Sequence, residues 1–258
     1  MKVVILCGGL GTRLREETEF RPKPMVNIGT RPILWHIMKT YAHYGFNDFV
    51  LALGYKGEMI KNYFFNYELM NNDVTIELGK PEKMHIHQVH EEVGWKVTLV
   101  DTGEKALKGA RLKKIEKYID EDQFLMTYGD GLSNVNIKSV TAFHQQHGRL
   151  ATVTGINLTA RFGELRIEGD QVLSFREKPK NGEGYINGGF MVLNRGIFDY
   201  LSSDDNCDLE YGPMEILAEE KKLMVYKHNG FWACMDTLRD MEYLNKLWQE
   251  NKAEWKVW

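Results

Sequence analysis

Cysteine is scarce in this chain of 258 residues, and its three copies are Cys7, Cys207 and Cys234. They are odd in number and lie far apart, so they do not form the framework of paired cysteines typical of small secreted domains. We expect free thiols in a reducing compartment. Cys7 directly precedes a glycine-rich stretch. At the end of a strand, Cys7 is better interpreted as a small buried residue than as a reactive thiol.

Long apolar runs are missing as well. No stretch approaches the ~20 residues that span a membrane, and the apolar strand begins at Val3, without the pattern of a signal peptide before it. We therefore expect a cytoplasmic protein with no membrane partner.

Neither sign of charge dominates, since 33 basic residues stand against 36 acidic ones. A nucleic-acid-binding domain usually carries a basic excess, so this balance argues against a nucleic-acid partner. Linkers, low-complexity runs and internal repeats are also absent, which predicts one domain over residues 1–258.

The chain does contain a regular alternation of apolar strands and amphipathic helices. Strands are predicted at 3–6, 49–53, 73–78, 96–100 and 124–128, and helices at 32–45, 56–67, 106–118 and 137–147. This order predicts an α/β fold with an open, mixed but mostly parallel sheet and helices on both faces. Strand-like segments at 149–156, 163–167 and 171–175 predict a small β-rich insertion that includes a hairpin.

The segment after the first strand is unusually rich in glycine. Five residues there are of special interest: Gly8, Gly9, Gly11, Thr12 and Arg13. Glycines after a buried strand let the backbone approach a ligand closely, and their freed N–H groups form a concavity that suits phosphate oxygens. Arg13 and Lys23 add positive charge. The segment thus predicts a polyphosphate cradle, with a simple tight turn as the alternative.

Two familiar phosphate cradles do not match this loop. A Walker loop needs Gly-Lys-Ser/Thr after four intervening positions, and no such run follows Gly8. A dinucleotide fingerprint needs a glycine where Leu14 stands and an unbroken helix where Pro22 and Pro24 occur. The loop is therefore predicted to be long and open, which disfavours a dinucleotide-dependent dehydrogenase.

An aspartate ends the strand at 124–128. Asp130 lies between Gly129 and Gly131, at the edge of the sheet where open α/β proteins bind ligands. A simple turn aspartate is the alternative. Asp236 follows a later aromatic strand and has two interpretations, a second ligand-facing carboxylate or the cap of a helix at 237–248.

At this point two motifs together carry a resemblance. GGLGTRL at 8–14 followed by RPKPM at 21–25 resembles the signature of sugar-1-phosphate nucleotidyltransferases. PILWHIM at 32–38, LVDTG at 99–103 and YGDG at 128–131 resemble the glucose-1-phosphate cytidylyltransferases in particular. The resemblance extends nearly from end to end and implies a Rossmann-like fold. In that fold, about residues 1–135 bind the nucleotide and about 136–258 form the sugar-phosphate-binding and C-terminal part.

The resemblance also implies residue roles, with Arg13 and Lys23 as the catalytic groups. Nucleotide-binding positions are Leu6, Gly8, Gly9, Leu10, Gly11, Thr12, Arg13, Lys23 and Arg111. Sugar-phosphate-binding positions are Gly129, Glu177, Lys178, Asn187 and Gly188. Asp130 and Asp236 would hold Mg²⁺ as the cofactor.

The implied reaction transfers a cytidylyl group from CTP to a sugar 1-phosphate, best represented by glucose 1-phosphate, and releases pyrophosphate. Ala106 and Ala110 depart from the usual family pattern, which leaves UTP or dTTP as alternatives for the nucleotide. The segment 80–94 could form a lid that is atypical of the family, which leaves another sugar-like phosphate as an alternative acceptor. A non-catalytic regulatory protein is disfavoured, because the two cations and both aspartates are present. Trp255 and Trp258 are expected to pack on the body or on a second subunit, and we expect a homo-oligomer.

The histidines at 85, 87 and 90 raise the question of zinc. No cysteine or carboxylate set near them completes a zinc site, so the alternating segment 84–90 is better interpreted as a protruding hairpin.

Overall fold

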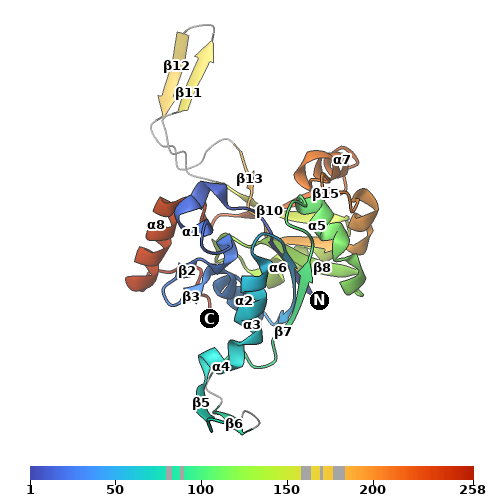
Figure 1. Cartoon of the computed structure of the whole chain (residues 1–258). Helices are drawn as coiled ribbons and strands as arrows, with labels where there is room; N and C mark the ends of the chain where they lie inside the picture. Colours follow the sequence, from blue (N-terminus) through green and yellow to red (C-terminus); the bar gives the residue numbers. More distant parts are fainter. Residues whose placement is uncertain (80–82, 88–89, 158–163, 169–170, 177–183) are drawn as a thin grey trace.

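The computed structural model describes residues 1–79, 83–87, 90–157, 164–168, 171–176 and 184–258. Figure 1 shows a central sheet flanked by helices, with the β5–β6 and β11–β12 hairpins projecting away from it. The strands run as follows: β1 (Val3–Cys7), β2 (Asn27–Ile28), β3 (Arg31–Pro32), β4 (Asp48–Leu53), β5 (Asp73–Ile76), β6 (Met84–His87), β7 (Lys96–Asp101), β8 (Gln123–Tyr128), β9 (Gly131–Ser133), β10 (Ala151–Ile156), β11 (Glu164–Glu168), β12 (Gln171–Arg176), β13 (Ile186–Asn187), β14 (Met191–Asn194), β15 (Leu223–His228) and β16 (Trp232–Cys234).

Helices fill the connections. The α-helices are α1 (Arg15–Thr18), α2 (Ile33–His43), α3 (Gly57–Phe65), α4 (Tyr67–Asn71), α5 (Lys108–Lys114), α6 (Ile137–His147), α7 (Glu215–Glu219) and α8 (Leu238–Gln249). Short helical turns are η1 (Thr12–Leu14), η2 (Lys23–Met25), η3 (Glu116–Tyr118), η4 (Arg195–Tyr200) and η5 (Glu210–Met214).

The central sheet is mixed and mostly parallel, which confirms the predicted fold class. Its strand order is β13, β10, β14, β8, β1, β4 and β7, with β15 paired to β10. Strand β1 is parallel to both of its neighbours, β4 and β8, whereas β14 joins β8 and β10 in the antiparallel sense.

Strand β1 is apolar throughout because both faces of the sheet are covered. Val3 and Ile5 pack into one core with α2, α6 and α8, and Val4 and Leu6 pack into the other with α5 and α7. All five residues of the strand are buried.

The topology determines where a ligand can bind. From β1 the chain passes through α2 to β4 and through α3 to β7, then returns through α5 to β8 on the other side of β1. The carboxyl ends of β1 and β8 therefore form the switch point of the sheet, where open α/β folds bind ligands. The glycine-rich segment starts at this edge, directly after β1, and Asp130 lies at the same edge, just after β8.

Two predicted elements differ in the structure. The strand expected at 73–78 is β5, which pairs with β6 in a separate hairpin and does not join the central sheet. Its side chains are exposed or half-buried, so it offers no apolar face to a layered core. The helix expected at 106–118 is shorter: α5 ends at Lys114 and a separate turn, η3, follows.

The β-rich insertion and the C-terminal tail agree with expectation. Strands β11 and β12 form an antiparallel hairpin. Trp255 is fully buried, and its indole and that of Trp258 lie beside His36 of α2, so the tail packs on the body of its own chain. Within the described ranges, no helix has both the length and the apolar character needed to cross a membrane.

Candidate active site

A cavity of about 530 Å³ lies at the carboxyl ends of β1 and β8. Five parts of the chain line it: the glycine-rich loop with Lys23, the start of α5, the segment 128–131, Asn187 with Gly188, and the later residues Glu210, Trp232, Cys234 and Asp236. Most of the sequence-predicted site residues are thus brought together. Leu10 is the exception among the described ones, because it does not line the cavity and its side chain is half exposed.

The loop after β1 depends on glycine at specific positions. Gly11 has a φ of 65°, in the left-handed region, and a Cβ atom there would lie 2.6 Å from the Thr18 side chain. The Thr18 hydroxyl holds this turn by donating to the carbonyl oxygen of Gly11 at 3.0 Å. A Cβ atom on Gly9 would meet nothing within 4 Å, so this stretch of backbone is open to a ligand.

Arg111 holds the backbone of the glycine-rich loop after β1 in place. Its side chain is 4% exposed, and its guanidinium donates to the carbonyl oxygens of Gly8 at 2.8 Å and Gly103 at 2.7 Å. Further bonds reach Leu53 and Thr102. Arg111 therefore ties the loop after β1 to the loops after β4 and β7. Its side chain is also part of the cavity wall, and its expected contact with the base stays a prediction.

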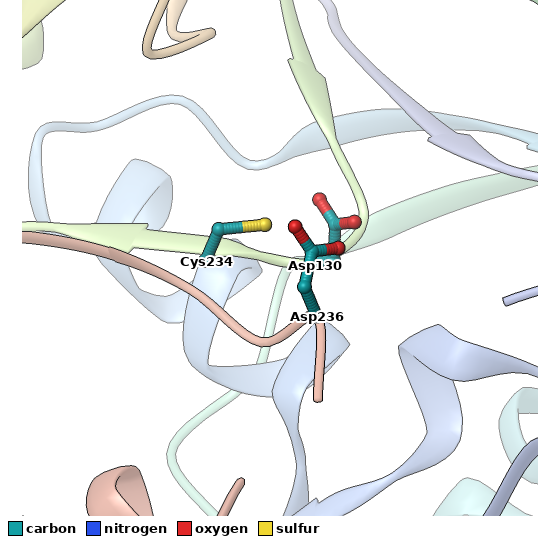
Figure 2. Close-up of side chains that lie close together, drawn as sticks. All are labelled: Asp130, Cys234 and Asp236. Carbon is teal, nitrogen blue, oxygen red and sulfur yellow. The ribbon is translucent and has the colours of Figure 1, made fainter. Parts of the chain in front are cut away.

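Four charged groups meet at one end of the cavity. Lys23 Nζ lies 2.6 Å from a carboxylate oxygen of Asp130 and 2.6 Å from one of Asp236. Arg13 Nη1 lies 2.8 Å from the other oxygen of Asp236. Asp130 follows β8 and Asp236 follows β16, and β16 pairs with β9 directly beyond Asp130, which brings the two aspartates together. Figure 2 shows their carboxylates beside the thiol of Cys234.

The surroundings set the charge of these groups. Burial opposes the charged form of Lys23, but the two aspartates outweigh burial and raise its pKa above the ordinary value. Burial likewise opposes the charge of Asp236, yet Lys23 and Arg13 hold the pKa of that carboxyl below its usual range. Lys23 and Asp236 are therefore both charged near neutral pH. Lys23 is buried, contrary to the expectation of an open loop, because it neutralises two carboxylates.

The donor set fits a hard divalent cation. In the described part of the chain, one group of potential ligands meets: an oxygen each from Asp130 and Asp236 and the sulfur of Cys234, all within 4.8 Å of one another. Burial and the adjacent carboxylates raise the pKa of the Cys234 thiol, so it stays protonated. Two carboxylates without a thiolate suit Mg²⁺ better than zinc.

Asp236 is not the cap of the following helix. Thr237 occupies the N-cap of α8, where its hydroxyl accepts a bond from the Asp240 N–H, and the Asp240 carboxylate accepts one from the Thr237 N–H. This reciprocal capping box leaves the Asp236 carboxylate directed at Lys23 and Arg13. The helix-cap alternative is therefore wrong.

The predicted sugar-phosphate positions are placed only in part. Gly129, Asn187 and Gly188 line the cavity. Glu177 and Lys178 lie outside the described residues.

Lys108, Tyr128, Glu210 and Trp232 also line the cavity, and none of them was among the predicted site residues. Tyr128 could have been found, since it ends the strand before Asp130. Glu210 lies in a segment where the sequence shows neither a motif nor a regular apolar spacing.

The comparisons with known proteins agree with this geometry. A family model described as nucleotidyl transferase matches residues 2–252. The chain belongs to the nucleotidyl transferase family. It is a nucleotidyltransferase, and the resemblance inferred from the two loop motifs is confirmed.

Relatives of this nucleotidyltransferase match over full length. A glucose-1-phosphate cytidylyltransferase from Salmonella typhi is 50% identical over 259 residues, with 100% of both chains covered. A probable glucose-1-phosphate cytidylyltransferase from Bacillus subtilis is 45% identical over 258 residues, again with 100% of both chains covered.

Solved structures share the fold. A UDP-glucose pyrophosphorylase in complex with UDP-glucose has a TM-score of 0.69 at 16% identity and covers 97% of this chain and 98% of its own. The inositol-1-phosphate CTP transferase from T. maritima has a TM-score of 0.68 at 14% identity, with 100% and 97% covered. At these identities the likeness supports the architecture alone.

Proposed function

We propose that this nucleotidyltransferase transfers a cytidylyl group from CTP to glucose 1-phosphate, with CDP-glucose and pyrophosphate as products. The full-length identity to two cytidylyltransferases supports the choice of substrates. The observation that carries the reaction type is the meeting of Lys23, Arg13, Asp130 and Asp236 at one end of the cavity. These groups suit a reaction between two polyanions.

The chemistry needs positioning and charge more than proton transfer. An oxygen of the sugar phosphate attacks the α-phosphorus of the triphosphate, and the bond to the β-phosphate oxygen breaks in line, so pyrophosphate leaves. The attacking phosphate is already ionised, so no general base is required. The enzyme must hold two anions together and stabilise the charge that develops.

Each group then has a task. Arg13 and the N–H groups of the glycine-rich loop bind the departing phosphates, and Lys23 binds the α-phosphate. Lys178 binds the sugar phosphate, and Asn187 a sugar hydroxyl. Residues 1–135 supply the nucleotide side of the cavity and residues 136–258 much of the acceptor side.

Enzymes of this family generally use a divalent metal ion, and we propose that Asp130 and Asp236 hold Mg²⁺. Bound there, the ion supplies positive charge to the phosphate oxygens. Lys23 contacts both carboxylates and Arg13 contacts that of Asp236, so these two cations would lie close to a phosphate bound at this end of the cavity. No nucleophilic thiol is needed, and burial raises the pKa of both Cys7 and Cys234.

Competition between substrates tests this function. The enzyme is given equal concentrations of CTP, UTP, dTTP, ATP and GTP with one sugar phosphate at a time, and products are identified by mass. CDP-glucose is expected as the main product. A UDP- or dTDP-linked main product contradicts the base assignment and leaves the reaction class unchanged. Turnover of another phosphate in place of glucose 1-phosphate confines the error to the acceptor side.

A further inference from the structure

A second polar cluster in the same cavity contains no metal ligand. It consists of Lys108, Tyr128, Asn187 and Glu210, all of which line the cavity. The Tyr128 hydroxyl donates to Glu210 Oε1 at 2.7 Å, and Lys108 Nζ lies 2.6 Å from Glu210 Oε2. Asn187 Nδ2 donates to the Tyr128 oxygen at 3.1 Å. The cluster thus connects the start of α5, the end of β8, η5 and β13.

Glu210 determines the direction of the hydrogen bonds at the Tyr128 hydroxyl. A carboxylate only accepts hydrogen bonds, so the single O–H of Tyr128 must point to Glu210. The Tyr128 oxygen is then left as an acceptor. It must receive its second bond from a donor, and the amide nitrogen of Asn187 supplies one. Lys108 Nζ forms an ion pair with the other oxygen of the same carboxylate.

Two neighbours together hold Asn187 in one of its two amide orientations. Its Oδ1 accepts the Gly189 N–H at 3.0 Å while its Nδ2 faces Tyr128. An amide NH₂ has two N–H groups, so one remains for a ligand in the cavity. Burial, together with the charge of Glu210, raises the pKa of Tyr128, so the phenol keeps the proton that this order requires.

We propose that Glu210 is a positioning residue for substrate selection: acting through Tyr128, and together with the Gly189 N–H, it holds the Asn187 amide so that it presents an N–H to a hydroxyl oxygen of the substrate. The inference rests on the proposed function, because that function places a hydroxyl-bearing ring beside Asn187. The hydroxyl belongs either to the acceptor sugar or to the ribose of the triphosphate. A missing hydroxyl leaves the presented N–H unpaired, and this penalty lets the site discriminate.

A purely structural role is the alternative, in which Glu210 only ties η5 to β8. Glutamine at position 210 separates the two roles. Glu210→Gln keeps the shape, but a glutamine can both donate and accept, so the Tyr128 hydroxyl is no longer held in one direction. The Asn187 amide then keeps only the Gly189 N–H to fix its orientation. Tyr128→Phe removes the hydroxyl that links Glu210 to Asn187.

The chain contains a matched control. Tyr200 donates to Glu220 Oε2 at 2.7 Å, and Lys222 Nζ lies 2.8 Å from the same oxygen. This second cluster also joins a tyrosine, a glutamate and a lysine, and none of its three residues lines the cavity. Glu220→Gln therefore removes an equivalent charge and equivalent bonds elsewhere in the molecule.

The experiment measures kcat and KM for pairs of substrates that differ by one hydroxyl. The pairs are glucose 1-phosphate against its 2-, 3-, 4- and 6-deoxy analogues, and CTP against dCTP. For wild type we expect one pair to show a clear preference for the hydroxylated member. In Glu210→Gln and Tyr128→Phe that preference should fall about 10-fold, the size of one hydrogen bond, mainly through KM. The double variant should lose no more than either single one, because the residues act in series.

A change in a sugar pair assigns the hydroxyl to the acceptor, and a change in the CTP pair assigns it to the ribose. Glu220→Gln should leave every preference as in wild type. The proposal is overturned if Glu210→Gln keeps all wild-type preferences, or if it lowers melting temperature and kcat without changing any ratio. Failure of the proposed function looks different: wild type itself then prefers another phosphate, and the same ratios are measured with that phosphate and its deoxy analogues.

Discussion

Lys23 contacts both candidate metal ligands, and this single side chain governs the charge of the site. Lys23 and Arg13 carry two positive charges, and Asp130 and Asp236 carry two negative ones, so the cluster is formally neutral without ligands. When a divalent ion and a triphosphate bind, the two aspartates can pair with the ion, and Lys23 and Arg13 can pair with the phosphates.

Replacing Lys23 by methionine tests this role while keeping most of the buried stem. We expect turnover to fall by ~10²–10³, because a charge-stabilising group of this kind is lost. The measurement is kcat at saturating substrates, together with the circular dichroism spectrum as a check of folding. Lys246→Met, on the exposed side of α8, is the control and should behave like wild type. Near-normal turnover of Lys23→Met would remove Lys23 from the mechanism.

The two aspartates should behave as one unit. Asp130→Asn and Asp236→Asn are each expected to abolish the Mg²⁺-dependent part of the rate, and the double variant should lose little more than either. Rates are measured against Mg²⁺ concentration. If the rate of the double variant instead falls by the product of the two single losses, the carboxylates do not share an ion.

Asp240→Asn is the matched control for the aspartates. It weakens the capping box of α8 and should lower the free energy of unfolding by about 1 kcal/mol. Because Asp240 also accepts the Asp236 N–H at 3.2 Å, the loss of kcat should be small beside that of Asp236→Asn, not absent.

At the scale of elements, the C-terminal tail is attached to α2 by aromatic packing. The Trp255 ring lies 6.2 Å from that of His36 and 5.5 Å from that of Phe231, centroid to centroid, and Trp255 is fully buried. Its indole N–H donates to His36 Nδ1 at 3.4 Å. The tail therefore belongs to the folded core, although it follows the last helix.

Trp255→Ala should cost about 3–5 kcal/mol in the free energy of unfolding, since a large buried ring leaves a cavity. Trp258→Ala should cost less, because Trp258 is only partly buried. Urea titrations of both variants measure the difference. Equal, small losses would mean that the tail is not part of the cooperative core.

At the scale of the whole molecule, His36 makes folding sensitive to acid. Its Nε2–H donates to the Ile28 carbonyl oxygen at 3.0 Å and its Nδ1 accepts from Trp255, so the buried ring is neutral. Burial lowers its pKa to about 4, against about 6.5 in an unfolded chain. The unfolded state therefore binds more protons between these two values.

It follows that His36 contributes full stability above pH 6.5 and that this contribution is lost as the pH falls from 6.5 toward 4. The loss can reach about 3 kcal/mol. Urea titrations between pH 4 and 7 measure it, with His36→Gln as the variant whose slope should be flatter. The ring resonances of His36 should not titrate near pH 6.5, and a normal titration there would contradict the buried neutral state.

Subunit number also belongs to this scale. Both terminal tryptophans pack within their own chain, so they give no support for an interface. The homo-oligomer stays a prediction, and light scattering during gel filtration measures it. A particle of the 30.0 kDa monomer mass would contradict it.

The sequence alone determined the features that depend on neighbours along the chain. The apolar run of β1, the glycine-rich loop after it and Asp130 at the end of β8 were predicted, because strand burial and turn conformation leave a local pattern. The same local pattern, as a double motif, was specific enough to identify the family before any contact was known.

Only the tertiary structure decided which distant groups meet. Lys23 and Asp236 are 213 positions apart, and they touch because β16 pairs with β9 beside Asp130. The helix-cap alternative for Asp236, the separation of β5 from the central sheet and the cluster around Glu210 were settled by the same kind of long-range packing. Hydrogen-bond direction and charge pairing depend on distances in space, and spacing along a sequence does not contain those distances.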